Sequence, residues 1–291
     1  MAAHLGPILV TGAAGYLGAH VLNAIYAAGG AATGASRDGR VGLACDLLDR
    51  SALRALLAAV RPAVVVHCAA ERVGSYDDTA AAARSVQMTR HLAEAGVQRL
   101  VHISSMTVYA PTQPMPAREE TTDPQSAYGL GKREAERVLE AAGGLAATIL
   151  RLPGLFGAPR RGGLVQQLCR AAALGLTPSL PAAPVMWAAM HVEDAASVVA
   201  RAALRPAAPT SILNVGYPGP HSINRLVALV AQASGAPLAT QVAHPVFEMD
   251  LSRLNAAYGP APGSLPERIR IALATAAGGP PTQSTGMEDA A

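Results

Sequence analysis

The stretch VTGAAGYLGAH, residues 10–20, places glycines at positions 12, 15 and 18, three residues apart. A short apolar run at residues 8–10 precedes these glycines, and a helix-like segment at 19–28 follows them. Glycine permits positive φ in a tight turn and lets ligand oxygens approach the backbone amides at a helix N-terminus. We therefore predict that this strand-to-helix connection holds the pyrophosphate of a dinucleotide. At Gly18, close packing of the helix on the strand is an alternative explanation.

Short apolar runs alternate with helix-period segments through the first half of the chain. This order, with strands apolar on both faces, predicts an α/β fold with a Rossmann-like, doubly wound parallel sheet. The predicted strands are residues 8–10, 31–35, 41–44, 64–67, 100–103 and 148–150, and the intervening helices include 50–59, 80–95 and 126–142. We expect a dinucleotide-binding domain at residues 1–155 with returns at about 191–216, a small C-terminal substrate-binding lobe at 156–190 and 217–277, and a disordered tail at 278–291.

The composition excludes several classes of function. Of 291 residues, 51% are hydrophobic and 15% charged, and the net charge of +3 is not clustered, so we expect neither a nucleic-acid nor a membrane partner. No apolar run approaches the ~18 residues of a membrane span, which predicts a cytoplasmic protein. The three cysteines lie far apart, so no disulfide framework and no metal site are expected.

Several motifs occur in an order that is more specific than any one of them. They are TGAAGYLG, CDLLD, VVHCAA, ISSMTVYA, Tyr128-x-x-x-Lys132, RLPGLFGAP and HVEDAA. Together they resemble the extended short-chain dehydrogenase/reductases, the NAD-dependent epimerase/dehydratase family, from residue 8 to about 273. The resemblance implies a Rossmann fold and an NAD(P)-dependent oxidoreductase.

The end of the second predicted strand bears on the choice of nucleotide. Ser36 stands where the NAD-preferring members of this family carry an acidic residue, and Arg37 follows it. A hydroxyl and a guanidinium suit a 2′-phosphate, so we predict that NADP(H) is preferred and NAD(H) is the alternative; a solvated surface arginine is the competing interpretation. The resemblance implies that Asp46 accepts a hydrogen bond from the adenine amino group. It implies cofactor contacts at the following residues: Gly12, Gly15, Tyr16, Leu17, Gly18, Asp46, Leu47, Ala69, Ala70, Arg72, Tyr128, Lys132 and Pro153.

Tyr128 and Lys132 are four residues apart in a predicted helix, so their side chains share one face. A phenol of pKa ~10 is a poor proton donor at neutral pH, and a neighbouring ammonium lowers its pKa by stabilising the phenolate. By the resemblance, Tyr128 donates the proton, Lys132 is its electrostatic partner, and Ser105 hydrogen-bonds the substrate oxygen. Ser85 departs from the family, because relatives carry asparagine there; a hydroxyl still suits a water or a main-chain carbonyl.

Residues that related enzymes carry and this chain lacks restrict the class of substrate. Met106 and Thr107 stand where sugar-nucleotide dehydratases carry an Asp-Glu pair, so dehydration is not expected. Trp187 stands where relatives clamp a diphosphate with arginine, and an indole suits a flat or apolar ligand. We therefore expect a ketoreductase-type enzyme that interconverts a ketone and a secondary alcohol on a small specialised metabolite lacking a diphosphate, with Ser105, Met106 and Trp187 near it.

Two alternatives remain open on the sequence alone. The first is a nucleotide-sugar epimerase or 4-ketoreductase, in which Arg160 or Arg161 replaces the missing clamp. The second is a nucleotide-binding regulator without catalysis, against which the retained Ser105, Tyr128 and Lys132 argue. The resemblance also implies a homodimer, formed through a four-helix contact that includes the helix bearing Tyr128.

Overall fold

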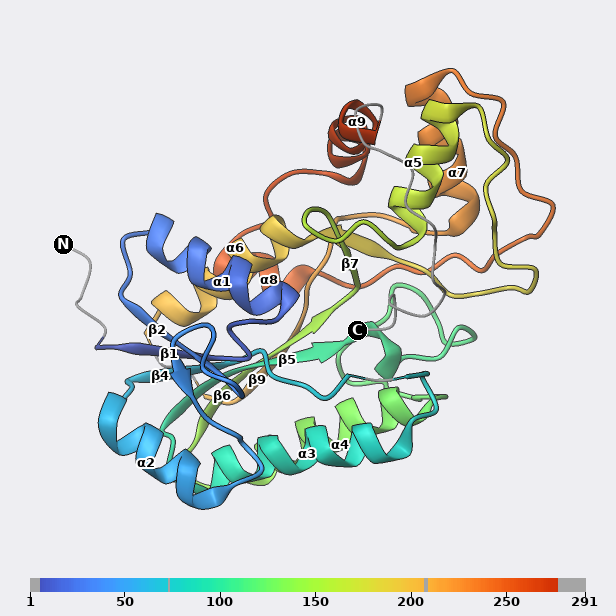
Figure 1. The fold of residues 1–291 in the computed structure, drawn as a ribbon. Helices are drawn as coiled ribbons and strands as arrows, with labels where there is room; N and C mark the ends of the chain where they lie inside the picture. The colour runs from blue at the N-terminus through green and yellow to red at the C-terminus, as the bar shows by residue number, and fades with distance from the viewer. Residues whose placement is uncertain (1–5, 73, 207–208, 277–291) are drawn as a thin grey trace.

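A single parallel sheet organises the chain (Figure 1), whose computed structural model describes residues 6–72, 74–206 and 209–276. Seven strands lie in the order β3-β2-β1-β4-β5-β6-β9, and every neighbouring pair is parallel. The predicted doubly wound sheet is therefore confirmed, while the predicted tail at 278–291 lies outside the described residues. The strands are β1 (Ile8–Thr11), β2 (Ala32–Ser36), β3 (Leu43–Ala44), β4 (Val64–His67), β5 (Arg99–Ser105), β6 (Ala146–Leu152) and β9 (Ser211–Asn214).

The strand order reverses between β1 and β4. From β1 the chain moves outward to β2 and β3, and it then crosses back to β4 on the other side of β1. The carboxyl ends of β1 and β4 therefore border the switch point at which open α/β sheets bind ligands.

Helices cover both faces of the sheet. One face carries α2 (Arg50–Val60), α3 (Thr79–Glu94) and α4 (Ala127–Ala141), and the other carries α1 (Tyr16–Ala27) and α6 (Val192–Leu204) (Figure 1). Apolar side chains of the inner strands alternate between the two cores, so that Val64 and Val66 join one and Val65 joins the other. Burial on both faces explains why these strands read as continuous apolar runs.

A second group of elements lies beyond the carboxyl edge of the sheet. Here α5 (Leu164–Leu174), α7 (Ile223–Ser234) and α9 (Leu265–Ala276) pack against one another (Figure 1). The other elements after β6 are β7 (Gly154–Phe156), which pairs with β8 (Ala189–His191), and α8 (Ser252–Tyr258). The sequence pattern did not predict the β7–β8 pair, because each strand has only three residues. Assignment of this group to substrate binding stays a prediction.

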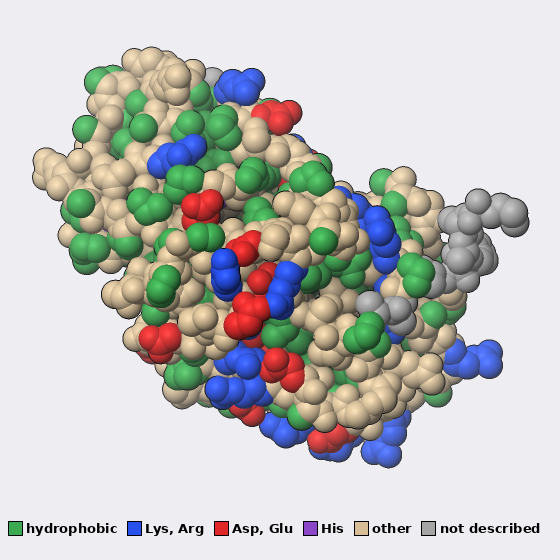
Figure 2. Space-filling view, turned by 180° about the vertical axis from the view of Figure 1, so that it is seen from behind, with side chains coloured by type: hydrophobic (Ala, Val, Ile, Leu, Met, Phe, Trp, Pro, Cys, Tyr) green, Lys and Arg blue, Asp and Glu red, His purple; other side chains and the backbone are tan. Residues whose placement is uncertain are grey.

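Charged side chains of both signs are mixed on the surface. In the view from behind, acidic and basic groups lie side by side in the middle of the face and along its lower edge (Figure 2). Among the described residues, no helix combines the length and the apolar character needed to cross a membrane.

Candidate active site

The glycine loop joins the end of β1 to the start of α1. Gly12 has φ +70°, and a Cβ there would lie 2.5 Å from the backbone nitrogen of Ala69, just after β4. Only glycine therefore fits between the two strand ends. A Cβ at Gly18 would lie 2.2 Å from the Gly12 carbonyl oxygen, so packing by itself accounts for that glycine.

The N-terminus of α1 suits an anion. Gly15 occupies the N-cap position without a side-chain cap, and no acidic residue lies in the first turn. The amides of this turn and the positive end of the helix dipole are thus directed at the switch point without a compensating carboxylate. The loop fits the pyrophosphate of a nicotinamide dinucleotide, which supplies or accepts hydride when bound.

The last residue of β2 and the residue after it have different environments. The buried Ser36 hydroxyl donates to the Val41 carbonyl oxygen at 3.1 Å and accepts from the Val41 amide at 3.2 Å. Its hydrogen-bonding capacity is used within its own turn, so recognition of a 2′-phosphate would fall to Arg37. Arg37 is 62% exposed and forms an ion pair with Glu71 after β4, so both the cofactor role and the solvated surface arginine stay open.

The other predicted nucleotide contacts lie along the same edge. Asp46 is exposed and accepts from the Leu48 amide at 3.0 Å, whereas Leu47 beside it is buried. Ala69 borders the glycine loop, while Ala70 and Arg72 are exposed. The last of them, Pro153, is buried between β6 and β7. Their roles toward a cofactor stay predictions.

The first turn of α4 packs on the segment that follows Ser105. Ser126 caps the helix by accepting from the Gly129 amide at 3.1 Å. A Cβ at Gly129 would lie 2.3 Å from the Thr107 carbonyl oxygen, so glycine allows α4 to approach η1 (Met106–Val108) this closely. This contact brings Tyr128 to the carboxyl end of β5.

Lys132 lies beneath Tyr128 on the same face of α4. Its Nζ is 5.5 Å from the centroid of the Tyr128 ring and donates to the Ile103 carbonyl oxygen at 3.0 Å. The ammonium is thus fixed between the helix and β5, beside the Tyr128 ring.

Ser105 ends β5 and is arranged to donate a hydrogen bond. Its Oγ accepts from the Thr107 amide at 3.2 Å and from Thr107 Oγ1 at 3.0 Å. With its oxygen accepting twice, the Ser105 proton remains available for a substrate oxygen. The sequence marked Thr107 only because it stands where dehydratases carry an acidic residue. In the structure its two hydrogen bonds orient the Ser105 hydroxyl.

Tyr76 is a neighbour of Tyr128 that the sequence did not reveal. Its carbonyl oxygen accepts from the Tyr128 amide at 2.8 Å, and the two rings meet edge to face with centroids 5.6 Å apart. Burial and the nearby Tyr128 raise the pKa of Tyr76, and the Arg160 guanidinium opposes this shift. Tyr76 lies in a loop without periodicity, so no sequence signal marked it.

The Ser85 hydroxyl is engaged locally. It accepts from the Glu71 amide at 3.0 Å and donates to the Ala81 carbonyl oxygen of its own helix at 2.9 Å. We considered that this hydroxyl holds either a water or a main-chain carbonyl. It donates to a main-chain carbonyl, and that carbonyl lies one turn earlier on α3. Its single proton is used there and is not free for a relay.

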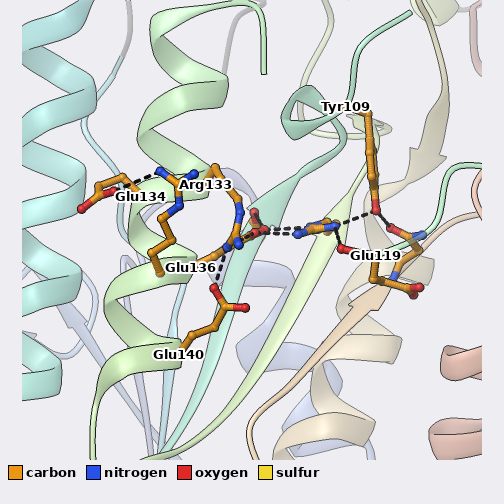
Figure 3. Close-up of polar contacts among 10 residues, drawn as sticks. Tyr109, Glu119, Arg133, Glu134, Glu136 and Glu140 are labelled. Atoms are coloured by element: carbon orange, nitrogen blue, oxygen red, sulfur yellow. Dashed lines mark hydrogen bonds and ion pairs between the residues drawn. The ribbon is translucent and has the colours of Figure 1, made fainter. Parts of the chain in front are cut away.

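A buried polar network ties α4 to the sheet (Figure 3). Glu136, one turn beyond Lys132, receives hydrogen bonds from Arg151 Nε at 2.8 Å and Nη2 at 2.7 Å, and from Ser104 Oγ at 2.5 Å. Both charged side chains are fully buried. Burial by itself lowers the pKa of Arg151, but the hydrogen bonds and charge of Glu136 raise it overall.

The same arginine reaches across the sheet. Arg151 Nη1 donates to the Tyr109 hydroxyl at 2.8 Å and to the Glu119 carbonyl oxygen at 2.9 Å. Tyr109 in turn donates to Asn214 Oδ1 at 2.6 Å, as Figure 3 shows on the side of the network away from Glu136. One guanidinium thus joins α4, β6, the segment after η1 and the end of β9.

Two predicted substrate contacts are largely enclosed. Met106 is buried, and Trp187 is partly buried and packs against the buried apolar core; their roles toward a substrate stay predictions. Arg160 lies closer to the nucleotide loop, because its guanidinium stands 5.1 Å from the Tyr16 ring centroid and donates to the Leu155 carbonyl oxygen at 3.3 Å. His191 is the N-cap residue of α6, and its ring packs on Phe156.

Two histidines are buried under the site without charge. His67 and His102 face each other on β4 and β5 with ring centroids 5.5 Å apart. Desolvation, with help from Lys132, lowers the pKa of His67 to about 3, and it lowers that of His102 well below its ordinary value. In the described ranges, His, Cys, Asp and Glu side chains do not gather into a group that could hold a metal ion.

Comparison with known proteins identifies the class. Residues 8–216 match the model of the NAD dependent epimerase/dehydratase family, so the chain belongs to that family.

Curated relatives with different functions are similar to about half of the chain. Methionine adenosyltransferase 2 subunit beta of Danio rerio is 37% identical over 157 residues, 52% of this chain and 48% of that protein. A probable dTDP-4,6-dihydroxy-2-methyloxan-3-one 4-ketoreductase of Streptomyces antibioticus is 35% identical over 161 residues, 51% of each chain. The chain thus spans about half the length of these curated relatives.

Solved structures share the fold over almost the whole chain. UDP-N-acetylglucosamine 4-epimerase of Bacillus cereus superposes with a TM-score of 0.80 at 21% identity, covering 96% of this chain and 99% of that one. UDP-glucose 4-epimerase of Thermus thermophilus, in complex with NAD, gives 0.75 at 22% identity, covering 94% and 99%.

Proposed function

We propose that this chain is an NAD(P)-dependent oxidoreductase that reduces the keto group of a nucleotide-linked sugar to a secondary alcohol. The observation that carries the proposal is the arrangement of Ser105, Tyr128 and Lys132 at the same carboxyl edge of the sheet as the glycine loop. The similarity to a 4-ketoreductase and to sugar epimerases favours a sugar substrate over the small metabolite that we expected from the sequence. Arg160, beside Tyr16, is the proposed replacement for the missing diphosphate clamp.

The proposed chemistry distributes three tasks among the chain's own residues. Ser105 donates its free proton to the carbonyl oxygen and so orients the substrate. Tyr128 protonates the same oxygen as negative charge develops on it, and Lys132 stabilises the phenolate that remains. We propose NADP(H) as the preferred cofactor because the Arg37 guanidinium directly follows β2, and NAD(H) as the alternative.

The test combines a substrate panel with one variant. Nucleotide-linked 4-keto sugars and simple ketones are offered with NADPH or NADH, and oxidation of the nicotinamide is followed. We expect turnover of the nucleotide sugars, and a loss of about 10²- to 10⁴-fold in Tyr128→Phe with unchanged nucleotide affinity. Turnover of simple ketones only, or an unaffected Tyr128→Phe, would refute the proposal.

Epimerisation is distinguished by the state of the purified protein. An epimerase returns the hydride to its own substrate, so it retains a stoichiometric nicotinamide and consumes none. A reductase exchanges its cofactor at every turnover. Stoichiometric bound nucleotide, together with interconversion of sugars and no net oxidation of NADPH, would decide for the epimerase.

A second candidate is a nucleotide-binding subunit without turnover. The similarity of half of the chain to a methionine adenosyltransferase subunit favours it. Tight binding of NADPH without its oxidation by any member of the panel would support this candidate.

A further inference from the structure

We propose that Glu71 limits the preference for NADP(H) by holding Arg37 away from the 2′-phosphate position. This inference rests on the proposed nucleotide-binding function. Arg37 is the first residue after β2, and Glu71 follows β4 by four residues. Because β1 lies between these strands, the Arg37–Glu71 ion pair spans the carboxyl end of β1, where the glycine loop begins.

Glu71 is the fixed member of the pair. Its side chain is only 14% exposed, and its amide is bonded to Ser85 Oγ at 3.0 Å. Its second carboxylate oxygen lies 3.9 Å from Arg84 Nε on α3. Arg37, in contrast, extends from a turn into solvent, so a change of partner requires movement of Arg37 alone.

The two nucleotides make different demands on this pair. A 2′-phosphate is recognised by the same guanidinium N–H groups that Glu71 engages, and its charge is repelled by the carboxylate. The uncharged ribose diol of NAD(H) does not need Arg37. The Ser36 hydroxyl, bonded to Val41, gives the phosphate no further donor. Glu71 therefore weakens NADP(H) binding selectively, and both cofactors remain acceptable.

The experiment measures dissociation constants of NADPH and NADH for the full chain by calorimetry. In Glu71→Gln, we expect NADPH to bind about five- to tenfold more tightly, while NADH changes less than about twofold. Glu140→Gln, which removes a carboxylate that pairs with Arg133 at 2.6 Å on α4, is the matched control and should change neither. Glu71→Ala serves as a second variant if the glutamine protein does not fold.

A double variant tests whether Glu71 acts through Arg37. In an Arg37→Ala background, Glu71→Gln should no longer improve NADPH binding by more than about twofold. A full gain in that background, equal gains for both nucleotides, or no gain at all would overturn the inference. If the wild-type chain binds neither nucleotide, the proposed function itself fails, whereas binding of both without any effect of Glu71 refutes this inference only.

Discussion

Glu136 offers the sharpest test of what holds α4 in place on the sheet. Glu136→Gln preserves the shape of the side chain but removes the charge that neutralises Arg151. The two hydrogen bonds from Arg151, of 2.8 and 2.7 Å, use both carboxylate oxygens, and the variant keeps only one of these acceptors. It also leaves a fully buried guanidinium without its counter-ion. Removal of one partner from a buried pair costs about 3–5 kcal/mol. For a chain of this size, the loss corresponds to a fall in Tm on the order of 10 °C.

Urea and thermal unfolding followed by circular dichroism measure this loss. Glu140→Gln is the control, because Glu140 is 38% exposed and its partner Arg133 keeps a second carboxylate in Glu136, so the loss should stay below about 1 kcal/mol. The double variant Glu136→Leu/Arg151→Met replaces both charges with apolar groups and should recover most of the stability. A cost for Glu136→Gln no greater than for Glu140→Gln, or a double variant no more stable than the single one, would refute the reasoning.

Three further predictions concern the glycine loop, the buried histidines and the serine. Gly12→Ala should abolish nucleotide binding in calorimetry and lower the free energy of unfolding by about 2 kcal/mol or more, because its Cβ would lie 2.5 Å from a backbone atom. The control Gly96→Ala has a similar φ of +79° but open space around the Cβ, so it should lower the free energy of unfolding by less. Burial lowers the pKa of His102 well below its unfolded value of ~6.5, so the free energy of unfolding falls as pH drops below about 6.5. In His102→Leu, urea titrations at several pH values should show this slope reduced by about 1.4 kcal/mol per pH unit. An unchanged slope would contradict the assignment. Ser105→Ala should lower kcat about 10²-fold and leave the nucleotide dissociation constant unchanged, and a parallel loss of binding would mean a structural role.

Local sequence patterns were sufficient to predict the overall fold. The alternation of apolar runs with helix-period segments predicted the parallel sheet, and the glycines of residues 12–18 predicted its first turn. The four-residue spacing of Tyr128 and Lys132 placed both on one helix face. These features depend on neighbours in the sequence, whose geometry is set by the backbone.

Contacts between distant residues were beyond such reasoning. Arg37 and Glu71 are 34 residues apart, and no periodicity relates them. The side chain of Arg151 lies inside a buried, largely apolar strand, where its partner Glu136 cannot be inferred from composition. For Ser36 the residue type suggested a ligand contact, but the hydroxyl is bonded to Val41 in its own turn.

Asn214 makes the part of the chain that matches the family model dependent on the C-terminal segment. Its Nδ2 donates to the Ala117 carbonyl oxygen at 3.0 Å and to the Asp250 carbonyl oxygen at 3.2 Å. The Ala117 amide donates to the Glu248 carbonyl oxygen at 2.7 Å, and the Ala117 carbonyl oxygen accepts from the Asp250 amide at 2.9 Å. A fragment that stops at the end of the family match would expose these polar groups beside the Tyr109 hydroxyl. Engineered exchange of the C-terminal segment between relatives should therefore carry residues 117–119 along with it as one unit.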